Sequence, residues 1–157
     1  MSHHISAILS KVYIAIENTN GSQTYATTTS AVVDVTTGDA SFTGQILTDG
    51  GYFFFVWNLV GGTTGSALTC AQANAGGGVD ALSTVTGGST AFDDVFTCTD
   101  GRGLTAGLPM GSYTVAISAL DSTTGVVGRA PTLPNEVISS PNKVTDLGTV
   151  TISIANM

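Results

Sequence analysis

The fold is decided by residues 92–130, FDDVFTCTDGRGLTAGLPMGSYTVAISALDSTTGVVGRA. This stretch contains a strand that carries a cysteine, then a glycine-rich turn, and then a segment in which apolar residues alternate from Tyr113 to Ala119. Alternation with a period of two is typical of a β-strand with one buried face. The stretch therefore predicts an all-β fold made of short strands.

The same alternation recurs along the rest of the chain, separated by turns that are rich in glycine, aspartate and asparagine. Many short strands at regular spacing are typical of two packed sheets. We predict an antiparallel Greek-key β-sandwich, immunoglobulin-like or transthyretin-like, with a loop or an edge strand over the proline-containing residues 131–141. Strands are expected over residues 8–16, 24–35, 41–47, 52–60, 79–85, 92–99, 113–119, 126–130 and 148–154.

The length of 157 residues suits one domain with a single core. We predict an N-terminal tail over residues 1–7 and a single β-sandwich domain over residues 8–155. The first twenty residues lack a cationic start and a long uninterrupted apolar run. They therefore predict neither an intact signal peptide nor a membrane span.

Acidic residues outnumber basic ones, eleven to four, which gives a formal net charge of −7. The four basic residues are scattered along the sequence. A chain of this charge is repelled by a nucleic-acid backbone and by an anionic membrane surface. We therefore expect neither as a partner.

The two cysteines, Cys70 and Cys98, lie in no CxxC motif and beside no histidine, so their spacing does not favour a metal site. We predict one disulfide within the domain, with two buried free thiols as the alternative. A bond that closes a loop of about 28 residues stabilises a fold by about 3 kcal/mol. Such a bond indicates an extracellular or cell-surface location, with the periplasm as an alternative.

Residues 52–59, YFFFVWNL, are apolar on both faces of the expected strand. The odd-numbered side chains would fill the core, which leaves Tyr52, Phe54 and Val56 on the opposite face. A strand of this kind is covered on both faces. The cover could be the chain's own long connection, a second subunit for which these three residues form an interface, or a sugar that stacks on the rings.

Two segments, residues 108–115 (LPMGSYTV) and 145–152 (TDLGTVTI), resemble a known family, together with Trp57, Cys70 and residues 96–101. They are similar to the prealbumin-like, or carboxypeptidase-regulatory-like, β-sandwich domains of bacterial secreted proteins and lipoproteins. In that family a Leu-Pro-x-Gly-x-Tyr-x-Val segment enters a central strand, and the last strand follows a short Asp-Leu-Gly turn. The resemblance covers about the C-terminal two thirds of the chain and implies a fold rather than one function, because such domains serve as spacers, adhesive modules and assembly subunits.

Candidate catalytic residues are few. The only histidines, His3 and His4, stand beside the first residue, where a general base is poorly positioned and no serine triad can be built. Asp93 and Asp94 are adjacent, so on a strand they face opposite sides and do not form a carboxylate dyad. Calcium bound at these aspartates or at Asp100 is a weaker alternative to solvated turn aspartates. We expect no enzyme activity and no cofactor.

One further chemical alternative is an intramolecular isopeptide bond between Lys11 and Asn156, assisted by Glu17 or another acidic residue. Both residues stand near the ends of the expected domain. The reaction would require the first and last strands to bring the two side chains together. We therefore do not favour it over an unmodified chain.

Two functions of different kinds follow from these features. The first is a secreted bacterial structural protein that self-associates, as a homo-oligomer, a filament or a surface-layer component, by burying apolar faces and pairing strands. The second is an extracellular adhesion module that binds a polysaccharide or a surface protein through Tyr52, Tyr25 or Trp57. A hydrolase is a third class, for which the sequence offers no catalytic set.

Overall fold

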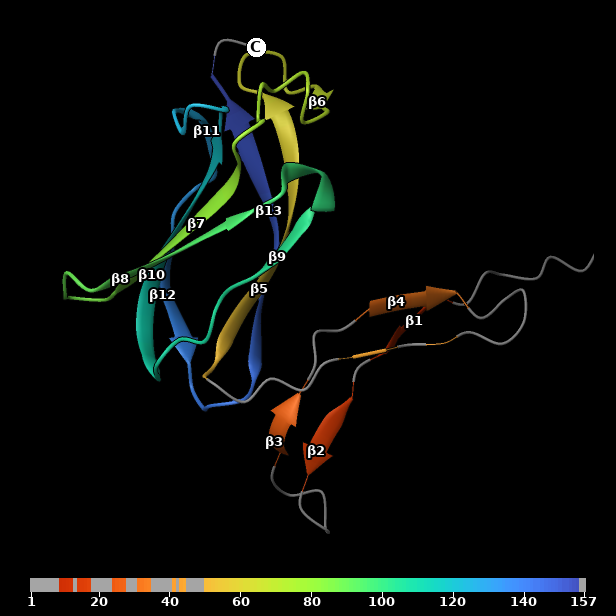
Figure 1. The fold of residues 1–157 in the computed structure, drawn as a ribbon, viewed down its shortest axis with the longest axis vertical. Helices are drawn as coiled ribbons and strands as arrows, with labels where there is room; N and C mark the ends of the chain where they lie inside the picture. The colour runs from red at the N-terminus through yellow and green to blue at the C-terminus, as the bar shows by residue number, and fades with distance from the viewer. Residues whose placement is uncertain are drawn as a thin grey trace, which may run out of the picture.

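The computed structural model describes residues 9–12, 14–17, 24–27, 31–34, 41, 43–44 and 50–155. These residues form three sheets, which Figure 1 shows as one curled body and two short strand pairs beside it. Strands dominate, and the described part contains only one short 3-10 turn, η1 (Cys98–Asp100). The expected all-β class is confirmed.

The large sheet has nine strands. They are β5 (Tyr52–Gly61), β6 (Ala67–Leu68), β7 (Gly78–Val85), β8 (Ala91–Phe96), β9 (Arg102–Leu104), β10 (Gly111–Leu120), β11 (Val126–Arg129), β12 (Leu133–Ile138) and β13 (Val144–Ile154). The two small sheets pair β1 (Leu9–Val12) with β4 (Ala31–Asp34), and β2 (Ala15–Glu17) with β3 (Thr24–Thr27).

The strand order of the large sheet is β6-β5-β13-β11-β10-β7-β8, with β9 also paired to β5 and β12 also paired to β10. Every pairing is antiparallel except that of β5 with β13, which is parallel and aligns Tyr52 with Val144 and Gly61 with Ile154. The predicted purely antiparallel sheet is therefore wrong, and the sheet is mixed. The long chain between β5 and β13 makes parallel pairing possible, since parallel neighbours need a crossover that a tight hairpin cannot supply.

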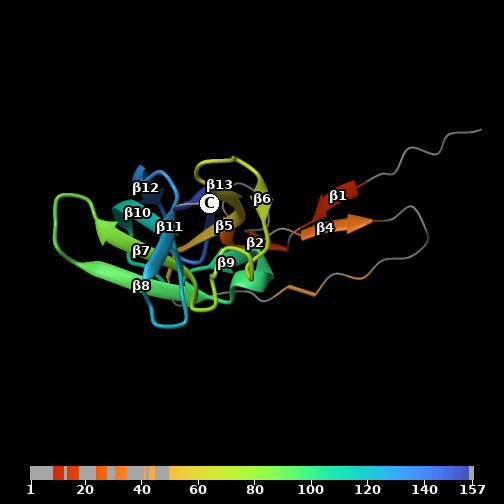
Figure 2. The same ribbon diagram turned by 90° about the horizontal axis from the view of Figure 1, so that it is seen from above.

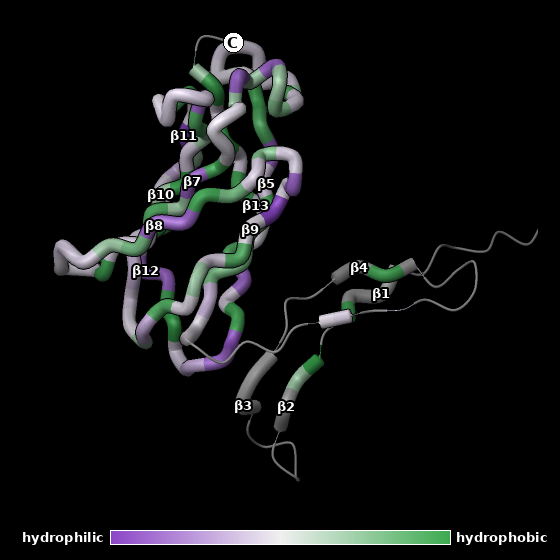
Figure 3. Tube along the Cα trace, in the orientation of Figure 1, coloured by the Kyte–Doolittle hydropathy of each residue, from purple (hydrophilic) through white to green (hydrophobic). Residues whose placement is uncertain are grey.

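The core lies on the concave side of this sheet. It contains the odd-numbered residues of β5, as the alternation predicted, and Phe53 meets Tyr113 of β10 edge to face with 5.7 Å between ring centroids. Figure 3 shows hydrophobic and hydrophilic residues alternating along the strands of this body. Residues from both strands are fully or almost fully buried, namely Phe53, Phe55, Trp57, Leu59, Tyr113, Val115, Ile117 and Ala119.

Two details differ from the expected strands, and a third agrees with one of the predicted alternatives. Cys98 lies in η1 rather than in a strand, because Gly101 ends that turn in the left-handed conformation, with a φ of 66°. The glycine-rich segment after it forms β9, too short for a sequence pattern to reveal. Residues 133–138 form β12, so of the loop and the edge strand predicted for 131–141 the edge strand is confirmed; it tolerates Pro134 because it pairs only with β10.

The strands β1 to β4 pair with each other and not with the nine-stranded sheet. The expected strands over 8–16 and 24–35 thus supply two short strands each. In the expected strand 41–47, the described residues Ser41, Thr43 and Gly44 are not in a strand, and the others lie outside the described residues, as does the predicted tail 1–7. Figures 1 and 2 show the β1–β4 pair and the β7–β8 hairpin on opposite sides of the molecule.

Candidate functional site

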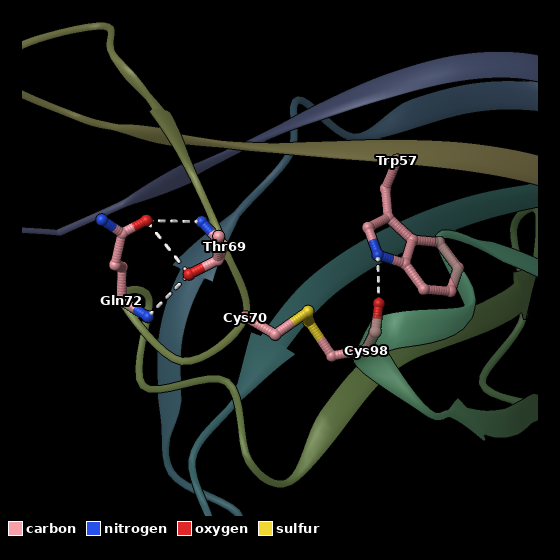
Figure 4. The surroundings of a disulfide bond; sticks show 5 residues. All are labelled: Trp57, Thr69, Cys70, Gln72 and Cys98. Atoms are coloured by element: carbon pink, nitrogen blue, oxygen red, sulfur yellow. Dashed lines mark hydrogen bonds between the residues drawn. A yellow bond between two sulfur atoms is a disulfide. The ribbon is translucent and has the colours of Figure 1, made fainter.

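The disulfide joins the two edges of the curled sheet. Cys70 follows β6 and Cys98 follows β8, and these strands stand at opposite ends of the strand order. Their sulfur atoms are bonded at 2.07 Å, as Figure 4 shows. The predicted pairing is confirmed, and the alternative of two free thiols is wrong.

Aromatic packing supports this closure. The indole Nε1 of Trp57 donates a hydrogen bond of 3.2 Å to the carbonyl oxygen of Cys98 (Figure 4). The ring of Phe96, on β8, packs edge to face against Phe55 of β5, with 5.5 Å between centroids. A Cβ on Gly103 would lie 2.8 Å from the Phe96 ring, so only glycine lets β9 approach this closely. The two edges are therefore held by packing as well as by the disulfide.

A groove of about 670 Å³ opens beside the disulfide, lined by Trp57, Leu59, Leu68 and both cysteines among others. The Trp57 side chain is only 5% exposed and that of Tyr52 only 2%. A ring this buried has no free face for a sugar. Two of the three aromatic residues expected as a stacking platform are thus occupied by the core, and the side chain of Tyr25 lies outside the described part of the chain.

The candidate interface residues Tyr52, Phe54 and Val56 lie along β5. Tyr52 is buried by the chain itself, which is one of the three covers expected for this face. Phe54 and Val56 are half-buried, and their backbones pair with β9, at Leu104 and Arg102. A role for Phe54 and Val56 between subunits stays a prediction.

The acidic residues of β7 and β8 form a pair that the sequence pattern missed. The register aligns Ala81 with Asp94 and Leu82 with Asp93. Because Ala81 is fully buried and Leu82 is exposed, the two aspartates face opposite sides, as predicted. The carboxyl group beside Asp93 is instead that of Asp80, on the neighbouring strand. The sequence carries one signal for this proximity: two neighbouring strands, joined by a hairpin, that each place an aspartate on the outer face.

Burial, together with the hydrogen bond to Asp93, raises the pKa of Asp80 to about 7. The negative charges of Asp93 and Asp94 act in the same direction, and the guanidinium of Arg129 acts against them. A hydrogen bond between two carboxyl groups requires that one of them be protonated. Asp80 can therefore take up or release a proton near neutral pH.

The described residues contain no group of three or more His, Cys, Asp or Glu side chains that could hold a metal ion. Asp94, one of the aspartates considered for calcium, faces inward, and its Oδ1 accepts a hydrogen bond of 3.0 Å from the backbone N–H of Ala106.

His3, His4 and Asn156 lie outside the described residues. The isopeptide bond between Lys11 and Asn156 therefore stays a prediction.

The outer edge of β8 is open. Val85 N–H donates to the carbonyl of Thr90, which fixes the hydrogen-bonding phase of the β7–β8 hairpin. In that phase the backbone groups of Ala91, Asp93 and Val95 point away from β7. All three residues are exposed, and Val95 is 57% exposed. We call these backbone groups the β8 edge, since no described strand pairs with them.

Comparisons with protein-family models, with curated proteins and with solved structures give no match. In the described part of the chain, no helix has the length and apolar character needed to cross a membrane.

Proposed function

We propose that this chain is a secreted structural subunit that self-associates through its sheet edges and has no catalytic centre of its own. The β8 edge is the observation that carries the proposal. Unpaired N–H and C=O groups in a row are a template for another strand. β8 contains neither proline nor lysine, two of the residues that block such pairing, and its only charged residues are Asp93 and Asp94.

The small N-terminal sheets support the same function. β1 pairs only with β4, and β2 only with β3, among the described strands. A two-stranded sheet on its own is marginally stable in water. Such strand pairs gain stability when they add to a larger sheet, and the β8 edge of another copy offers one.

The proposal includes a secreted, extracellular or cell-surface location, with the periplasm as an alternative. The disulfide is compatible with it, because such bonds persist in oxidising compartments. It also fixes the relative position of the two sheet edges, which suits a subunit that must present one edge in a constant geometry.

The proposal extends to the finer fold type, a prealbumin-like Greek-key sandwich of the immunoglobulin-like or transthyretin-like kind. Residues 108–115 lead into β10, which lies between β7 on one side and β11 and β12 on the other. The Tyr113 hydroxyl donates a hydrogen bond of 2.7 Å to the carbonyl of Pro109 and so fastens this connector. Both features support the resemblance.

The alternative function is an adhesion module for a polysaccharide or a surface protein, for which the open groove beside the disulfide is the available site. Because Trp57 and Tyr52 are buried, self-association is better supported.

Light scattering on size-exclusion fractions, with negative-stain images over a range of concentrations in oxidising buffer, tests the proposal. We expect oligomers that grow with concentration. Monomers at every concentration would contradict self-association. A glycan that binds on an array and then changes the Trp57 fluorescence in solution would favour the adhesion module.

A further inference from the structure

We propose that copies join head to tail, with β1 of one molecule pairing with the β8 edge of the next so that Lys11 comes opposite Asp93. This inference rests on the proposed self-association and names the two surfaces that meet. The partner is a second copy of this chain.

The placement of the two strands supports a contact between copies. The β1–β4 pair and the β7–β8 hairpin lie on opposite sides of the molecule (Figures 1 and 2). Among the described strands, β1 pairs with β4 alone, and none of them pairs with its second edge. Each molecule thus presents a donor edge and an acceptor edge at different places. A contact between two different surfaces repeats without closing unless its rotation closes a ring, so it builds a chain of molecules.

Charge complementarity selects β1 as the occupant. Lys11 is the only lysine or arginine before Arg102. Asp93 lies on β8 with its side chain exposed, on the same outer face as Val95. Pairing Lys11 with Asp93 therefore sets a positively charged residue of β1 opposite a negatively charged residue of β8, an arrangement that stabilises a strand pair.

An antiparallel register also pairs two apolar residues of the two strands. With Lys11 opposite Asp93, Leu9 comes opposite Val95, and opposed residues lie on the same face of a sheet. Val95 is 57% exposed in the single chain, and an aliphatic neighbour would cover it. The pairing therefore matches a lysine to an aspartate and a leucine to a valine.

The symmetric alternative, in which two β8 edges pair with each other, is disfavoured. Antiparallel pairing of two β8 strands about a two-fold axis at Asp93 would set the Asp93 residues of the two copies directly opposite each other. Like charges that face each other across a strand pair are destabilising. The aspartate thus protects the edge from another β8 while attracting β1.

A charge exchange tests the inference. Asp93→Lys and Lys11→Asp are each expected to weaken association about tenfold or more, measured by sedimentation velocity. An equimolar mixture of the two variants is expected to assemble again, because every contact then joins a lysine to an aspartate. Asp100→Lys makes the same charge change at an exposed position of η1 and is the matched control, expected to assemble like the wild type. Circular dichroism confirms that each variant keeps its strands.

The outcomes separate the two proposals. If the wild type assembles but Asp93→Lys assembles equally well, or the mixture stays dissociated, the β1–β8 contact is wrong while self-association stands. If the wild type is monomeric at every concentration, both proposals fail.

A peptide of residues 8–16 in excess is expected to shorten the assemblies, whereas the same peptide with Lys11→Asp is not. Equal effects of the two peptides would also overturn the pairing.

Discussion

Cys70 and Cys98 belong to opposite ends of the strand order, yet their Cα atoms lie 6.0 Å apart and their sulfur atoms are bonded. One covalent bond therefore ties both edges of a single sheet. The Trp57 indole is tied to one of these cysteines, because its Nε1 donates a hydrogen bond to the Cys98 carbonyl. Loss of the bond should therefore let the two edges of the sheet move apart, whereas a disulfide within one loop would affect that loop alone.

Replacing both cysteines, Cys70→Ser with Cys98→Ser, is expected to lower the free energy of unfolding by about 3 kcal/mol, because the unfolded chain regains the freedom of a loop of about 28 residues. Urea denaturation followed by Trp57 fluorescence measures the loss. The wild type in reductant is the control and should lose a similar amount. An unchanged midpoint in both would show that aromatic packing alone closes the sheet.

Stability should fall as the pH rises from about 4 to about 7. The folded pKa of Asp80, about 7, lies above its ordinary value of 3.8, so the folded state binds more protons in this window. Because Asp80 is partly open to solvent, the expected loss is only roughly 1 kcal/mol. Asp80→Asn should flatten the dependence of the urea midpoint on pH. A midpoint that rises with pH over this window in the wild type, and equally in the variant, would contradict the assignment.

Gly103→Ala is expected to destabilise the protein by about 1–3 kcal/mol, since the new Cβ would lie 2.8 Å from the Phe96 ring and push β9 away from it. Gly76→Ala is the matched control, because the nearest atom to its Cβ is 3.8 Å away. Thermal unfolding should separate the two variants. Equal melting temperatures would mean that β9 and β8 are not in contact in solution.

Ser83→Ala is expected to raise the free energy of unfolding by about 1 kcal/mol. The Ser83 hydroxyl is fully buried and has no hydrogen-bond partner in the described structure, so its removal relieves an unpaired polar group. Ser118→Ala provides the contrast, because the Ser118 hydroxyl accepts a hydrogen bond of 3.2 Å from Arg129, and its loss should be neutral or costly. Denaturant titrations of both variants measure the difference, and a destabilised Ser83→Ala would contradict the prediction.

Strands with strong alternation could be predicted from the sequence, because burial of one face leaves a period of two in the residues. β5 and β10 are examples, and the disulfide followed from the scarcity of cysteine. β9 and β6 could not be predicted, since segments of two or three residues carry no period. The parallel pairing of β5 with β13 depends on packing between distant segments and leaves no local trace.

The acidic pair shows the same limit at the candidate site. Asp93 and Asp94 are adjacent in the sequence, and the alternation of a strand correctly predicted that they lie on opposite faces. Asp80 is far from both in sequence, and only the register of β7 with β8 brings it beside Asp93. The open β8 edge likewise depends on the strand order, which no single segment encodes.

Amide hydrogen exchange of the β8 strand, measured in dilute and in concentrated protein, tests self-association through this edge most directly. The N–H groups of Ala91, Asp93 and Val95 point away from β7 and should exchange fast when dilute and at least tenfold more slowly in the assembly. Those of Phe92 and Asp94, which bond to β7, provide the internal reference and should change little. Fast exchange of the three edge amides at every concentration would contradict the proposed assembly.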